Sequence, residues 1–173
     1  MISRRNFLKS CLVGASLVSF RTAFASRSTD RVLDMENIHT GERLNIPYCL
    51  SDVYDVEALE RINYFLRCHY TNKVMPIDVG VLDLLCDIKD MIGRQRSIQI
   101  VSGYRSDVYN EKLARESRKV SKNSLHLQGR AIDFSIGGIS SSKTARLAQS
   151  FGAGGVGKYP EFVHIDVGRV RSW

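Results

Sequence analysis

The stretch SLHLQGRAIDFSI, residues 124–136, decides the fold because it joins a polar loop to a buried strand. From residue 131 onward, large apolar side chains occupy every second position, at residues 132, 134 and 136. On a strand these side chains face the core together, so Asp133 is displayed on the opposite face. The stretch therefore predicts a central strand that carries a carboxylate, with His126 in the loop before it.

The stretch FVHID, residues 162–166, shows the same alternation near the C-terminal end. His164 and Asp166 share one face of this predicted strand, and apolar residues occupy the other. Two imidazoles and one carboxylate form the ligand set of a catalytic Zn²⁺ that keeps one position open for water. If His126, Asp133 and His164 converge, the sequence predicts a metal hydrolase.

The order of the other elements indicates the fold class. Apolar residues at helical spacing, together with capping residues, predict helices over residues 55–69, 78–92, 108–119 and 143–151. Alternation and turn signals predict two short strands within residues 32–46 and further strands at 98–102, 131–136 and 162–167. The late strands lack helical crossovers. This order favours an α+β single domain in which a small antiparallel sheet packs against helices.

The first 25 residues have the pattern of an export signal. SRRNFLK at residues 3–9 is a twin-arginine pattern, a short apolar stretch follows, and AFA at residues 23–25 offers a cleavage site. We expect residues 1–25 to be a Tat signal peptide and 26–173 to be the mature domain. The protein is then periplasmic, with no stable membrane anchor after cleavage. The alternative is an uncleaved N-terminal anchor.

The charge of the mature chain gives little support to nucleic-acid binding. The signal holds four of the 25 basic residues and none of the 18 acidic ones, so a net charge of +3 remains. A local basic cluster lies between Lys112 and Lys122. It is interpreted either as a solvated helix face or as an attraction to an anionic polymer such as cell wall.

Three cysteines remain after the signal, namely Cys49, Cys68 and Cys86. An odd number in an oxidising compartment permits at most one intramolecular disulfide. No Cys-x-x-Cys or Cys–His spacing indicates a metal or redox role. Cys68 and Cys86 fall in predicted helices, where they fit as small core residues.

Several segments together resemble a known family. They are SGYRS at residues 102–106, SLHLQGRAID at 124–133, VHID at 163–166, GGVGKYP at 154–160 and RVRSW at 169–173. These segments resemble the zinc D,D-carboxypeptidases and endopeptidases of peptidase family M15, in particular the exported murein endopeptidases of the YcbK (MepK) type. The resemblance covers essentially the whole chain. It implies a fold like that of the hedgehog and D,D-peptidase domains.

The resemblance also implies roles for individual residues. It implies that the zinc ligands are His126, Asp133 and His164. It implies that Arg105 holds a substrate carboxylate or backbone group near the metal. Tyr104 and Ser124 are candidates for orienting substrate or ligand, and strand-end packing or turn hydrogen bonding is the alternative for both.

Two residues are candidates for the catalytic carboxylate. Glu161 stands three residues before His164, the offset at which classical members of the family place an acid. Asp166 shares the face of His164 and is a candidate either for the base or for orienting a metal ligand. The sequence leaves both possibilities open.

The function implied by the resemblance is zinc-dependent hydrolysis of peptide cross-links in peptidoglycan, with a role in cell wall remodelling. The linkage is either D-Ala to diaminopimelate or diaminopimelate to diaminopimelate. Two alternatives remain: a non-catalytic module that binds cell-wall peptide, and a small dipeptidase or carboxypeptidase of the same fold.

Overall fold

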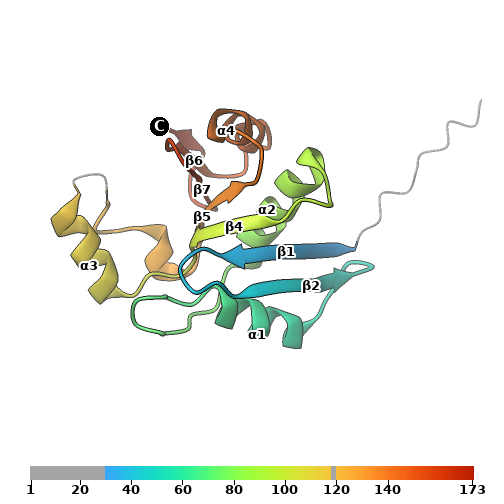
Figure 1. Ribbon diagram of the computed structural model, residues 1–173, viewed down its shortest axis with the longest axis horizontal. Coiled ribbons are helices and arrows are strands. Elements are labelled where there is room, and N and C mark those ends of the chain that lie inside the picture. The colour runs from blue at the N-terminus through green and yellow to red at the C-terminus, as the bar shows by residue number, and fades with distance from the viewer. Residues whose placement is uncertain (1–29, 118–119) are drawn as a thin grey trace, which may run out of the picture.

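The computed structural model describes residues 30–117 and 120–173. Its centre is one eight-stranded sheet with the strand order β3-β2-β1-β4-β5-β7-β6-β8 (Figure 1). The strands are β1 (Arg31–Asn37), β2 (Arg43–Leu50), β3 (Val53–Tyr54), β4 (Ile98–Ser102), β5 (Ala131–Ile136), β6 (Gly155–Lys158), β7 (Val163–Asp166) and β8 (Arg171–Ser172).

The sheet is mixed rather than purely antiparallel. β1 and β2 form an antiparallel hairpin, and β5 pairs antiparallel with both β4 and β7. β1 pairs parallel with β4, and β6 pairs parallel with β8. The predicted α+β single domain is confirmed, but the sheet has more strands than the small one expected and includes two parallel pairings.

Each α-helix begins at a residue whose side chain accepts a backbone N–H of the first turn, as expected for an N-cap. The caps are Asp55, Asp78, Ser106 and Ser140. The helices are α1 (Val56–Phe65), α2 (Val79–Ile92), α3 (Asp107–Glu116) and α4 (Ser141–Ser150), and η1 (Leu125–Gln128) is a short 3₁₀ helix.

The apolar core lies between the sheet and three helices. α1 contacts β2, α2 contacts β1 and β7, and α4 contacts β5, β6 and β7. Ile132 and Phe134 of β5 are fully buried in this core, as the alternation predicts. α3 lies apart from these helices, to one side of the sheet (Figure 1). The face of β5 that carries Asp133 is thus turned away from the apolar core.

Several element boundaries differ from those expected. The helix predicted over residues 55–69 ends at Phe65, because Leu66 leaves the helical conformation and the chain turns so that Cys68 N–H bonds Lys73 C=O. Cys68 therefore lies outside a helix. Cys49, Cys68 and Cys86 are all buried as free thiols.

The predicted Tat signal lies outside the described residues. None of the helices in residues 30–117 and 120–173 has the length and apolar composition needed to cross a bilayer.

Candidate active site

The register of two neighbouring strands brings Asp133 and His164 together. β5 and β7 run antiparallel, and Asp133 lies directly opposite His164 in the register. Side chains at directly opposed positions share a face and lie close together. The Asp133 Oδ1 atom is 2.8 Å from His164 Nδ1. The proximity of Asp133 and His164 thus follows from the alternation of apolar and polar residues on β5 and β7 and from the register in which the two strands pair.

His126 reaches the same point from η1. Gly129 ends this 3₁₀ helix in the left-handed region, with φ of 66°, and a Cβ at this position would collide with the Pro76 carbonyl. Only glycine fits such a position without strain. The His126 Nε2 atom lies 3.2 Å from both His164 Nδ1 and Asp133 Oδ1.

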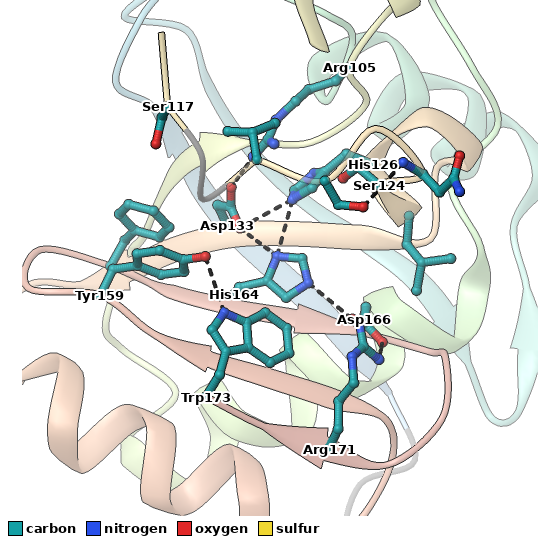
Figure 2. A pocket seen from close by; sticks show the side chains of 15 residues that line it. Arg105, Ser117, Ser124, His126, Asp133, Tyr159, His164, Asp166, Arg171 and Trp173 are labelled. Atoms are coloured by element: carbon teal, nitrogen blue, oxygen red, sulfur yellow. Dashed lines mark hydrogen bonds and ion pairs between the residues drawn. The ribbon is translucent and has the colours of Figure 1, made fainter. Parts of the chain in front are cut away.

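Hydrogen bonds on the far side of each imidazole determine which nitrogen faces the centre. His126 Nδ1 donates to the Gly103 carbonyl at 2.7 Å, because a carbonyl can only accept. His164 Nε2 donates to Asp166 Oδ2 at 3.0 Å for the same reason. His126 Nε2 and His164 Nδ1 therefore both direct lone pairs toward Asp133 (Figure 2).

The three converging atoms fit a metal ion. All are acceptors, and they lie within 4.8 Å of one another. Ligand atoms bound about 2.0–2.2 Å from a tetrahedral ion lie about 3.3–3.6 Å apart. The observed separations of 2.8 and 3.2 Å are slightly shorter. Acceptors at this distance repel one another unless a cation or proton lies between them. The site thus suits a divalent cation.

Burial and neighbouring charges shift the pKa values of these groups. Burial alone would raise the pKa of Asp133, but the neighbouring His126, His164 and Arg105 hold it well below its usual range. Burial lowers the pKa of His126, which favours the neutral ring. Burial also acts to lower the pKa of His164, but hydrogen bonds to Asp133 and Asp166 outweigh it and raise that pKa. Metal binding here competes with a proton on His164.

Asp166 is fully buried behind His164. Its Oδ1 accepts the backbone N–H groups of Gly155 and Gly168 at 3.0 and 2.8 Å, and Arg171 Nη2 bonds its Oδ2 at 2.6 Å. These donors, with His164, outweigh the effect of burial and hold the pKa of Asp166 well below its usual range. Asp166 is therefore a fixed anion that orients the His164 ring.

Arg105 approaches the site from the opposite side. Its Nη2 bonds Asp133 Oδ2, and its Nε donates to Ser102 Oγ at 3.0 Å. Asp133 Oδ1 is thereby left to face the two imidazoles. Arg105 also lines the cleft that contains the site.

The cleft has a volume of about 360 Å³. Its walls include Ser124 and the loop that precedes η1 on one side, and Tyr159 and Trp173 on the other (Figure 2). Phe162 also lines the cleft. The sequence alone assigned no function to the three aromatic residues or to Arg171. The runs GGVGKYP and RVRSW contain three of these four residues, but nothing in their spacing indicates that they meet at the cleft.

Two candidates lie elsewhere. Tyr104 is buried in the hydrophobic core, and its backbone N–H donates to the Leu66 carbonyl, so it does not line the cleft. Glu161 is exposed and is also absent from the cleft lining among the described residues. The offset of three residues places it on the turn before β7, and a turn does not preserve the alternation that aligns His164 with Asp166.

Comparisons with known proteins identify the family of the chain. The family model described as peptidoglycan L,D-endopeptidase MepK, a peptidase M15 family, matches residues 25–173. Peptidoglycan L,D-endopeptidase MepK of Escherichia coli (strain K12) is 42% identical over 155 residues, which span 87% of this chain and 85% of the relative. A probable peptidoglycan L,D-endopeptidase MepK of Haemophilus influenzae is 38% identical over 154 residues, or 87% and 83% of the two chains. The family resemblance inferred from the motifs is confirmed: this chain belongs to the MepK family of M15 peptidases.

Proposed function

We propose that this protein is a zinc-dependent endopeptidase that hydrolyses L,D peptide cross-links of peptidoglycan during cell wall remodelling. The observation that carries the proposal is the convergence of three lone pairs, from His126, Asp133 and His164, in one cleft. The names of the relatives support peptidoglycan as the substrate and the L,D class of bond.

His126 Nε2, Asp133 Oδ1 and His164 Nδ1 would hold the zinc ion. Bound there, Zn²⁺ would lower the pKa of a water molecule to about 7 and would polarise the scissile carbonyl. A set of three protein ligands leaves the fourth position open, as in other catalytic zinc sites. Asp166 keeps the His164 lone pair directed at the centre by accepting the Nε2–H.

Arg105 is proposed to bind the substrate. Within residues 30–117 and 120–173, two of its five N–H donors are used by Ser102 and Asp133, and Arg105 lines the cleft. Peptidoglycan peptides carry free carboxylates beside their cross-links, and guanidinium groups bind carboxylates strongly. Ser124, which also lines the cleft, is proposed to contact the peptide backbone.

The two acidic candidates differ in what they are able to do. Asp166 is already fully hydrogen-bonded, so we assign it a positioning role rather than that of the base. Glu161 lies outside the cleft lining. To act as a base, it has to enter the cleft by a movement of the turn at residues 159–162.

We therefore expect Glu161→Gln to cleave nearly as fast as the wild type. Cleavage should remain within about threefold, whereas loss of a general base costs about 10²–10⁴-fold. The rate of peptide release from purified murein measures the effect. Glu60→Gln, a matched change at an exposed residue of α1, is the control. A drop of a hundredfold in Glu161→Gln alone would return the role of base to Glu161.

Digestion of purified murein tests the proposed activity. Cross-linked muropeptide dimers should disappear and monomers should appear, as followed by chromatography and mass spectrometry. The masses of the new ends identify which linkage is cut. Release of single terminal residues with intact cross-links would instead indicate the carboxypeptidase or dipeptidase alternative.

We further propose that the protein is exported to the periplasm by the Tat pathway. The motivation is the twin-arginine pattern around Arg4 and Arg5, and the family match begins only at residue 25. Arg4→Lys combined with Arg5→Lys should trap the precursor in the cytoplasm, and wild-type mature protein should begin at Ser26. Cell fractionation and N-terminal sequencing measure both outcomes. Normal periplasmic delivery of the double variant would contradict the Tat assignment.

A further inference from the structure

Tyr159 is placed at the cleft by one aromatic contact, one side-chain hydrogen bond and one backbone hydrogen bond. Its ring stacks on Phe162, with centroids 4.5 Å apart and planes 14° from parallel. Its backbone N–H donates to the Phe162 carbonyl at 3.0 Å, which closes the turn between β6 and β7. The hydroxyl points into the cleft lined by His164 and Asp133 (Figure 2).

Trp173 fixes the position of this hydroxyl. Its Nε1–H donates to Tyr159 Oη at 3.2 Å. Trp173 is itself held at the end of β8, because its N–H bonds the Val156 carbonyl and its carbonyl accepts Lys158 N–H. Gly157 leaves room for the indole, since a Cβ there would lie 2.6 Å from the ring. These contacts hold the indole in place although Trp173 is 51% exposed.

The direction of this hydrogen bond leaves the phenol proton available. An indole N–H can only donate, so Tyr159 Oη is the acceptor and keeps its own proton to give. Among residues 30–117 and 120–173, no acceptor takes that proton. A phenol that accepts a hydrogen bond is also a stronger donor, because hydrogen bonds in a chain polarise one another.

Several other donors in the cleft are already used. The N–H groups of His126 and His164 bond Gly103 and Asp166. Arg171 bonds Asp166 with both terminal nitrogens. The Tyr159 hydroxyl is thus an uncommitted donor on the side of the cleft formed by the turn between β6 and β7, separate from Arg105.

We propose that Tyr159 is a catalytic residue that donates a hydrogen bond to the carbonyl oxygen of the scissile peptide bond as that oxygen becomes negatively charged. Trp173 is the positioning residue that holds the phenol in place. The proposal deepens the proposed function and rests on it. A preorganised donor of this kind acts mainly in the transition state, so its loss lowers kcat more than it changes KM.

The test is Tyr159→Phe, which keeps the ring stacked on Phe162 and removes only the hydroxyl. We expect kcat for murein peptide cleavage to fall by about 10²–10³-fold, as for other lost oxyanion donors. KM, zinc content and melting temperature should stay close to wild type. Trp173→Phe, which removes the indole N–H but keeps an aromatic ring, should lower kcat by a smaller factor.

Tyr64→Phe, at an exposed tyrosine of α1, is the matched control and should cleave like the wild type. A purely structural Tyr159–Trp173 contact would lower the melting temperature and leave kcat unchanged, and that result would overturn the inference. A change in KM alone would overturn it as well. If the wild type itself releases no peptide, the proposed function fails first, so the two failures are distinguishable.

Discussion

His126→Ala and His164→Ala should each remove both the metal and the activity. Wild-type protein should bind close to one equivalent of zinc, because three acceptor atoms converge in a buried site. Removal of one imidazole leaves two ligands and an opening for water, so the remaining pair cannot hold the ion during purification. Metal analysis of the purified variants and peptide release from murein measure the two losses.

His39→Ala is the matched control for these variants. His39 is exposed and its ring stacks on His69, and neither histidine is among the described residues that line the cleft. This variant should keep full zinc content and activity. Full zinc occupancy in His126→Ala or His164→Ala would show that the metal site has been assigned to the wrong residues.

Asp166→Asn should weaken zinc binding by about 10–100-fold, the usual effect of removing a partner that orients a metal ligand. The carboxylate accepts bonds from His164, from Arg171 and from two backbone amides while fully buried. The side-chain amide of Asn has one acceptor oxygen, and its NH₂ group would face the donors that now bond the Asp166 carboxylate. His164 would therefore lose its fixed orientation. Buried donors left unpaired cost about 1–3 kcal/mol each, so the melting temperature should fall as well.

Competition with a zinc chelator measures the affinity, and thermal unfolding measures the stability. Asp52→Asn makes the same chemical change at an exposed residue and should leave both values unaltered. Wild-type zinc affinity in Asp166→Asn would remove Asp166 from the machinery of the site.

The sequence predicts the centre of the site because alternating apolar and polar residues show which side chains share a face of a strand. Apolar residues at 132, 134 and 136 place Asp133 on the polar face of its strand, and the same rule places His164 beside Asp166. The structure adds the register that sets Asp133 opposite His164. Register depends on which strands pair, and that is not encoded within either stretch.

The outer parts of the site could not be predicted in this way. β8 is two residues long, too short for a period, so nothing indicated that Arg171 and Trp173 return to the cleft. β3 is also two residues long, so its sequence could not predict it either. The parallel pairing of β1 with β4 depends on a long connection through two helices, which local patterns do not specify. Glu161 was predicted only from its position three residues before His164. On a turn, such a spacing does not determine where the side chain points.

Zinc-dependent release of peptide from purified murein tests the central claim most directly. Metal-free protein should release none, release should rise in proportion to bound zinc up to one equivalent, and His164→Ala should release none at any zinc level. Wild-type protein that binds murein but releases no peptide at any zinc concentration would contradict the account and would identify the domain as a non-catalytic binding module.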